Sequence, residues 1–295
     1  MNRARASMLI VIGAGIVAVA CGATSTADVP APSAGGASAE AASVAPSPTL
    51  APGQLKVLAL DALSPAAADE ARTLGRSVGI AIYVPSQRRL YQYNAEPQFG
   101  MASVVKVPIM LTVLDRAIDQ RRSLTAGESS LLQAMIVESD NDATTALWNE
   151  IGGAPAVQNY LDSNGILSAY IDARDWGNSK MSAESAARLL GKLLNGEILD
   201  APSRALALEL MSVVDPIQSW GAVVAGSFEG RTGVKNGWYP EYNGWVLGSI
   251  GYVVPDSRAP DYTIAIFTSG WLYFNEGVHS IEAIAGLISA ALLSG

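Results

Sequence analysis

Apolar strand patterns occur at both ends of the globular part of this chain, and helical patterns fill the stretch between them. Strands are expected at 78–84 and 89–93 near the start, and at 244–254 and 262–269 near the end. The spacing of apolar residues predicts helices over 62–74, 103–117, 130–137, 143–151, 182–194, 202–213 and 276–293. This order indicates an α+β domain in which one sheet unites the N- and C-terminal parts of the chain.

The first twenty residues have the pattern of a secretory signal. Arg3 and Arg5 precede an apolar run over 8–20, which is shorter than the roughly 20 residues that span a bilayer. The tetrapeptide Ala18-Val19-Ala20-Cys21 resembles a bacterial lipobox, with Ala18 where Leu is preferred. The resemblance implies cleavage before Cys21, lipidation of its thiol, and an extracytoplasmic protein anchored to the cell membrane. The alternative is an ordinary signal peptide followed by an unrelated cysteine.

The segment 21–54 is rich in Ala, Ser, Pro, Gly and Thr. Such a composition buries too little apolar surface to offset the entropy of ordering the chain. It predicts a flexible tether in front of a single domain over 55–295. A tethered monomer is the default expectation.

The composition excludes several classes of function. With one Cys and one His in 295 residues, an internal disulfide and a Cys/His zinc site are ruled out, and nothing indicates an organic cofactor. The formal net charge of −8, without a run of Lys or Arg, argues against a nucleic-acid partner. A Ser-His-Asp enzyme would have to use His279, which falls in the last helix and is better explained as structural.

The first candidate motif is Ser103-Val104-Val105-Lys106, at the start of a predicted helix. A serine hydroxyl needs a neighbouring base to become a nucleophile, and a lysine one helical turn away can reach it. Burial would lower the pKa of this lysine, and the helix start favours negative charge at Ser103. The alternative is a capping serine with a surface lysine.

The second candidate motif is Ser139-Asp140-Asn141. A second hydroxyl can relay a proton to a leaving amine, and the Asn141 amide can hold a substrate carbonyl or the Lys106 amine. The alternative is a helix cap, because Ser, Asp and Asn are all favoured there.

The third candidate motif is Lys235-Asn236-Gly237-Trp238, just before the strand expected at 244–254. A lysine on an edge strand can bind a substrate carboxylate, and Gly237 allows a close approach to the backbone. One alternative is a glycine-containing turn. Another is that Arg231-Thr232-Gly233 is the true motif, although Lys235 stands nearer the following strands.

Taken together and in this order, the three motifs resemble those of class A β-lactamases and penicillin-binding proteins, over about residues 60–295. The resemblance implies an antiparallel sheet flanked by helices, with an all-helical subdomain over about 104–225. It implies that Ser103 is acylated, that Lys106 is its base and that Ser139 passes the proton to the leaving nitrogen. Asn141 would position Lys106 and substrate, and Lys235, with Asn236 and Gly237, would hold the substrate carboxylate. The backbone N–H groups of Ser103 and Trp238 would form the oxyanion hole.

The sequence also departs from that family. Asn236 replaces the usual Thr or Ser, and the gap between Lys106 and Ser139 is short, which predicts a more open site. The loop 168–178 has no glutamate to activate the deacylating water. Asp172 or Asp175 could substitute, but capping and solubility explain them more simply, and the tryptophans, Trp176 included, are expected as core or wall residues. Deacylation is therefore expected to be slow.

Three functions remain open. The first is a serine hydrolase that is acylated by β-lactams and hydrolyses the β-lactam amide. The second is a D,D-peptidase or esterase that acts on cell-wall peptide. The third is a non-catalytic lipoprotein that binds peptidoglycan or a protein partner. The retention of the key side chains of all three motifs favours an enzyme or covalent binder.

Overall fold

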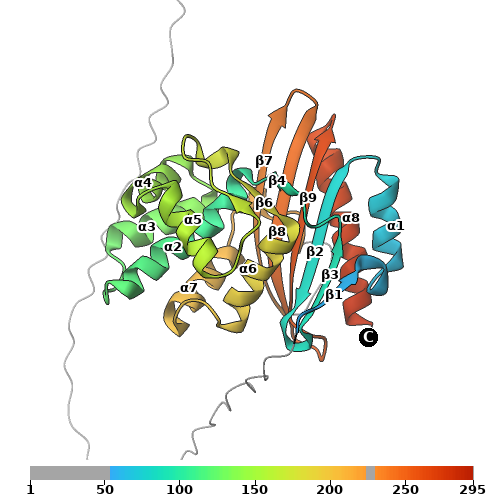
Figure 1. Ribbon diagram of the computed structural model, residues 1–295, viewed down its shortest axis with the longest axis horizontal. Coiled ribbons are helices and arrows are strands. Elements are labelled where there is room, and N and C mark those ends of the chain that lie inside the picture. The colour runs from blue at the N-terminus through green and yellow to red at the C-terminus, as the bar shows by residue number, and fades with distance from the viewer. Residues whose placement is uncertain (1–53, 224–229, 295) are drawn as a thin grey trace, which may run out of the picture. The chain divides into compact units, whose positions relative to one another are not determined.

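The structure, a computed structural model, describes residues 54–223 and 230–294. These residues form three layers, in which a sheet lies between a pair of helices and a larger group of helices (Figure 1). The predicted signal segment, Cys21 and nearly all of the predicted tether lie outside the described residues.

The central sheet contains six strands in the order β1-β3-β2-β9-β8-β7. Neighbouring strands are antiparallel except for β1 and β3, which are parallel. In the pairing of β2 with β9, Ile80 lies opposite Ile266, so the two ends of the chain meet in one sheet and the predicted α+β class is confirmed. The strands are β1 Lys56–Ala59, β2 Ser77–Val84, β3 Arg89–Tyr93, β7 Gly230–Glu241, β8 Gly244–Pro255 and β9 Tyr262–Trp271.

The helices fall into two groups. One face of the sheet carries α1 Pro65–Thr73 and α8 Phe274–Leu293, and the other side carries the helical middle of the chain (Figure 1). That middle consists of α2 Lys106–Asp119, α3 Ala126–Gln133, α4 Asn141–Ile151, α5 Ala154–Ser163, α6 Ala183–Asn195 and α7 Ala201–Ser212. Short 3₁₀ turns lie at Leu60–Ala62, Pro85–Gln87, Ala102–Val105, Trp176–Asn178 and Pro216–Gln218, and a π-helical turn at Ala134–Glu138.

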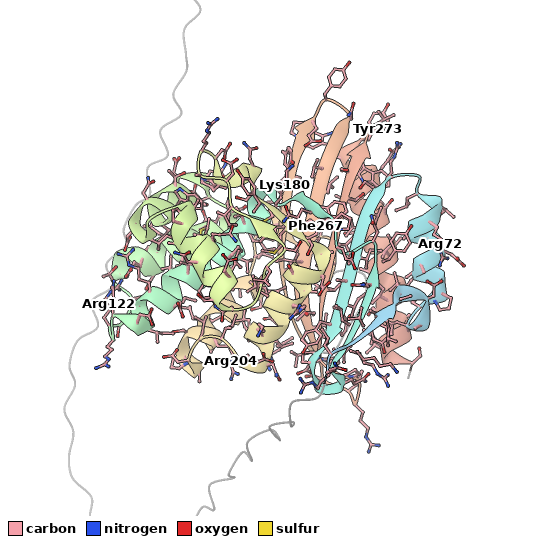
Figure 2. All side chains as sticks on the ribbon, viewed as in Figure 1. Arg72, Arg122, Lys180, Arg204, Phe267 and Tyr273 are labelled. Atoms are coloured by element: carbon pink, nitrogen blue, oxygen red, sulfur yellow. The ribbon has the colours of Figure 1, made fainter. Side chains whose placement is uncertain are left out.

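Two apolar cores separate these layers. The first lies between the sheet and the helical middle and includes Phe267 (Figure 2). The Phe267 ring stacks on that of Phe99, with 6.0 Å between the ring centroids. The second lies under α1 and α8 and includes Ile281, Ile284 and Ile288. By length and composition α8 could cross a membrane, but its buried isoleucines belong to the core, as in a core helix of a globular domain.

A second, three-stranded sheet fastens the helical middle to the segment before Ser103. Its strands are β4 Gln98–Gly100, β5 Ala169–Tyr170 and β6 Lys180–Ser182. Gly100 pairs with Lys180, and the Met101 N–H donates to the Ser179 carbonyl at 2.9 Å. The loop between β5 and β6 is therefore held beside the turn that carries Ser103.

Candidate active site

Ser103 lies in the 3₁₀ turn Ala102–Val105 and is partly exposed. The preceding Ala102 has a positive φ of 45°, which costs a non-glycine residue about 1–3 kcal/mol. Lys106 begins α2, and its N–H donates to the Ser103 carbonyl. Ser103 and Lys106 therefore lie one turn apart at a helix N-terminus, where the helix dipole favours negative charge.

The Lys106 ammonium group is completely buried. Its Nζ donates to the Ser139 carbonyl at 2.5 Å, to Asn141 Oδ1 at 2.8 Å and to Ser139 Oγ at 3.1 Å. Burial lowers the pKa of Lys106 to about 8, against an opposing effect of the Asp140 carboxylate. A lysine with this pKa has an appreciable neutral fraction near neutral pH, so it can accept a proton.

Ser139 has the left-handed backbone φ of 58° and ends the π-helical turn Ala134–Glu138. π-helical turns occur often at functional sites, and here the turn and the cap at Asp140 fix Ser139. The Asp140 carboxylate accepts from the Ala143 N–H at 2.6 Å and begins α4. The helix cap considered from the sequence is therefore present at Asp140, and it leaves Ser139 and Asn141 free to contact Lys106.

Lys235 lies near the middle of β7, one of the two edge strands of the six-stranded sheet, rather than in a turn. It is 1% exposed, and its Nζ donates to Ser139 Oγ at 2.9 Å. Burial lowers the pKa of Lys235 to about 7, with a further contribution from the Lys106 charge. Arg231 lies exposed at the start of β7. The geometry thus brings Lys235, not Arg231, to Ser139.

Gly237 explains how β7 approaches the nucleophile. A Cβ atom at this position would lie 2.4 Å from the Met101 carbonyl oxygen and 2.7 Å from the amide nitrogens of Ser103 and Val104. These are backbone atoms that cannot move aside, so only glycine fits. The next residue, Trp238, places its ring in an aromatic cluster with Trp220 and Phe274, at centroid distances of 5.7 and 5.6 Å.

Asn236 is fully buried and turned toward another part of the chain. Its Nδ2 donates to the carbonyl oxygens of Gln218 and Trp220, each at 2.8 Å. From the sequence we expected the Asn236 amide to contact the substrate carboxylate. The structure instead shows it bracing the segment 216–223 behind β7.

The loop between β5 and β6 contains the two aspartates that were considered as deacylation bases. Asp172 Oδ1 accepts from the N–H groups of Arg174 and Asp175, and Asp175 Oδ1 accepts from the Gly177 N–H. These hydrogen bonds lower the pKa of Asp172, which makes its carboxylate a weaker base. Both side chains stabilise the loop, as the capping interpretation predicts.

The same loop carries a residue whose position the sequence did not reveal. The Trp176 ring lies over Lys106, with 5.3 Å between Nζ and the ring centroid, and its Nε1 donates to Thr145 Oγ1 at 3.3 Å. No motif identifies such a contact, because it depends on the second sheet bringing the loop back to α2.

His279, by contrast, is exposed on α8, which packs on the other face of the sheet.

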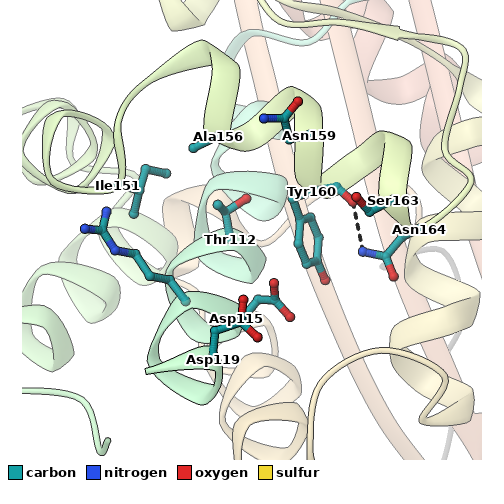
Figure 3. Close-up of a pocket in the computed structure, with 10 residues that line it drawn as sticks. Thr112, Asp115, Asp119, Ile151, Ala156, Asn159, Tyr160, Ser163 and Asn164 are labelled. Carbon is teal, nitrogen blue, oxygen red and sulfur yellow. Dashed lines mark hydrogen bonds between the residues drawn. The ribbon is translucent and has the colours of Figure 1, made fainter. Parts of the chain in front are cut away.

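A separate hollow of about 470 Å³ lies between α2 and α5 (Figure 3). Asp115, Asp119 and Tyr160 are among its lining residues, and burial raises the pKa values of Asp115 and Tyr160. Its lining offers no serine with a lysine beside it. Within 54–223 and 230–294, no group of three or more His, Cys, Asp and Glu side chains is placed to hold a metal ion.

The fold is that of the class A β-lactamases. The extended-spectrum β-lactamase TLA-3 superposes with a TM-score of 0.72 at 17% identity, over 79% of this chain and 99% of that one. A β-lactamase from Xanthomonas campestris pv. campestris gives a TM-score of 0.70 at 19% identity, over 79% of this chain and 98% of that one. This confirms the predicted arrangement of sheet and helices.

The family follows from the sequence. Residues 128–292, more than half of the chain, match the Beta-lactamase enzyme family, so the chain belongs to that family. Curated relatives in Mycobacterium tuberculosis and Mycobacterium bovis, each named "Putative lipoprotein LppW", are 26% identical over 208 residues, which is 65% of this chain. The match spans 64% of the length of those relatives.

Proposed function

We propose that this protein is a serine hydrolase that β-lactams acylate at Ser103. The observation that carries the proposal is that Lys106 and Lys235 both donate to the hydroxyl of Ser139, beside the turn of Ser103. A hydroxyl has two lone pairs and one proton. Because both lone pairs are occupied, the Ser139 hydroxyl retains only its donor function, which suits delivery of a proton to a leaving nitrogen.

Acylation would proceed as follows. Neutral Lys106 accepts the Ser103 proton, and Ser103 Oγ attacks the β-lactam carbonyl carbon, while the N–H groups of Ser103 and Trp238 stabilise the oxyanion. The amide C–N bond breaks, Ser139 gives its proton to the ring nitrogen, and the Lys106 ammonium returns a proton to Ser139. The net result is an ester on Ser103 and an N–H on the opened ring.

Substrate binding would rely mainly on Lys235. A β-lactam carboxylate beside its Nζ would keep the ammonium charged and offset the cost of its burial. Asn141 holds Lys106 and is exposed enough to contact substrate as well. We assign Asn236 to support of β7 and the segment 216–223, since its amide hydrogens are directed to carbonyl groups there.

We also propose that the protein is exported and anchored through Cys21 as a monomer. The lipobox-like sequence supports export and anchoring, and so does the name of the mycobacterial relatives, which are called lipoproteins. The monomer is the default expectation. Labelling cells with a radioactive or alkyne-bearing fatty acid tests the anchor. Label should appear on the wild-type protein and be lost in Cys21→Ala; label that persists in this variant would contradict the assignment.

The proposed activity is tested by incubating the full chain with benzylpenicillin and measuring its intact mass over time. We expect a mass increase equal to the whole drug, located on Ser103 by peptide mapping, and its absence in Ser103→Ala. Drug loss without a persistent adduct would mean rapid turnover. If the protein forms no adduct and the drug is not consumed, β-lactam acylation is excluded. A cell-wall D-Ala-D-Ala peptide would then be tested for cleavage.

A further inference from the structure

The Trp176 indole covers the buried Lys106 amine in addition to the hydrogen-bond partners of that amine. The hydrogen bonds of Nζ among the described residues go to Ser139 and Asn141, and the indole lies over the same amine at 5.3 Å. An aromatic ring at this distance stabilises the ammonium form but excludes water from that face. The amine that would activate a water molecule is therefore covered.

Trp176 is held in place from two directions. Its Nε1 donates to Thr145 Oγ1, and the Thr145 hydroxyl in turn donates to the Asn141 carbonyl at 2.9 Å, so the indole is fixed to the start of α4. The loop behind it is braced by Asp172 and Asp175, and the Asp172 N–H donates to Ser179 Oγ at 3.1 Å. The ring is thus part of a rigid loop rather than a free surface side chain.

No carboxylate replaces the covered amine as a base. The loop 168–178 contains no glutamate, and the carboxylates of Asp172 and Asp175 accept hydrogen bonds from their own loop. Asp140 accepts from the Ala143 N–H at the helix cap. Among the residues that the structure describes near Ser103, Lys106 and Lys235 have strongly lowered pKa values. In the proposed complex Lys235 stays charged on the substrate carboxylate, which leaves Lys106 to take a proton from water.

We propose that Trp176 keeps the acyl group on Ser103 by excluding the hydrolytic water, so that the protein is a covalent binder of β-lactams more than a rapid hydrolase. This inference rests on the proposed acylation of Ser103. Hydrolysis requires water oxygen to attack the ester carbonyl, Lys106 to accept the water proton, and Ser103 Oγ to leave with that proton, which yields a carboxylic acid. Trp176 opposes the second of these events by keeping water away from Lys106.

The variant Trp176→Ala should open the amine to water. We expect two changes: a lifetime of the benzylpenicillin adduct shortened at least about tenfold, and an acylation rate whose rise with pH moves to higher pH. The second follows because burial is the main cause of the lowered pKa of Lys106, so hydration raises this pKa by more than the loss of the ring's attraction for the ammonium lowers it. The other charges around Lys106, on Lys235 and Asp140, are unchanged. A merely structural role would not move this pH profile.

The experiment follows the adduct mass of full-length protein after excess drug is removed, for wild type, Trp176→Ala and Trp176→Phe. Trp176→Phe keeps a ring over the amine and should retain most of the lifetime, although it loses the bond to Thr145. Equal lifetimes for wild type and Trp176→Ala would overturn the role of Trp176 while leaving the acylation of Ser103 intact. No adduct on the wild-type protein would instead overturn the acylation itself, and this inference with it.

Discussion

Lys106 and Lys235 donate to one common acceptor, the Ser139 hydroxyl oxygen, at 3.1 and 2.9 Å. Two ammonium groups this close repel each other in a buried site, and burial lowers the pKa values of both, to about 8 and about 7. The pair therefore titrates as a unit, and its two protons leave near these two values. By these values the singly protonated pair carries its proton mainly on Lys106. The form that suits the proposed reaction, with the proton on Lys235, is the minor one, and a substrate carboxylate beside Lys235 would favour it.

This coupling predicts a bell-shaped pH dependence for the second-order rate of acylation. Below about pH 7 both lysines are protonated and no base is available; above about pH 8 both are neutral and no cation holds the carboxylate. We expect the maximum between these values. The measurement is the adduct formation rate at limiting drug from pH 5.5 to 10. A rate that climbs steadily to pH 10 would contradict a charged partner at Lys235.

Ser139→Ala should slow acylation by about a hundredfold or more, because it removes the donor to the leaving nitrogen and the shared acceptor of both lysines. Stopped-flow measurement with a chromogenic cephalosporin reports the rate. The matched control is Ser130→Ala on α3, where an exposed hydroxyl donates to the Ala126 carbonyl of its own helix. If the two variants react equally fast, Ser139 is not the proton donor.

The sequence predicts the α+β class and the three motifs because each depends on local patterns. It places Lys235 on an edge strand but gives no bounds for a strand over 230–241, because β7 is defined by pairing with β8 and its own sequence contains three glycines and a proline. It also omits α5 and the three-stranded sheet, whose short strands have too few residues to show a period. The two unforeseen side-chain positions, Trp176 over Lys106 and Asn236 against 218–220, both depend on long-range contacts.

Gly237→Ala should reduce acylation by about a hundredfold or more. The added methyl would lie 2.4–2.7 Å from backbone atoms of Met101, Ser103 and Val104, so β7 or the nucleophile turn must shift, and a shift near 1 Å is enough for such a loss. Gly127→Ala in α3 is the control, since its methyl finds nothing nearer than 3.9 Å and helix propensity favours alanine. Unchanged acylation in Gly237→Ala would mean that the strand approaches the serine less closely than described.

Asn236→Thr restores the residue usual in this family, yet we expect a less stable protein without faster acylation. Threonine cannot reach both carbonyl groups that Asn236 Nδ2 now satisfies, so the buried Gln218 and Trp220 oxygens lose their partner. The expected loss is about 1–3 kcal/mol in the free energy of unfolding, measured by urea denaturation. The control is Asn149→Thr, at an exposed position of α4. A tenfold faster acylation in Asn236→Thr would show that this position contacts substrate after all.

Lys106→Met should abolish acylation but raise the free energy of unfolding at pH 7 by about 1–3 kcal/mol. The pKa of this lysine falls from 10.5 to about 8 on folding, so the unfolded chain binds more protons between these values and wild-type stability rises with pH there. The loss of stability caused by burying the charged amine is fully present below about pH 8 and disappears by about pH 10.5. Urea titrations at pH 7 and 10 measure the free energy of unfolding of both the variant and the wild type. The control is Lys56→Met, because Lys56 is exposed. If Lys106→Met is instead less stable than wild type at pH 7, the three hydrogen bonds of Lys106 stabilise the protein by more than the burial of its charge destabilises it. The folded site would then not favour the neutral form of Lys106.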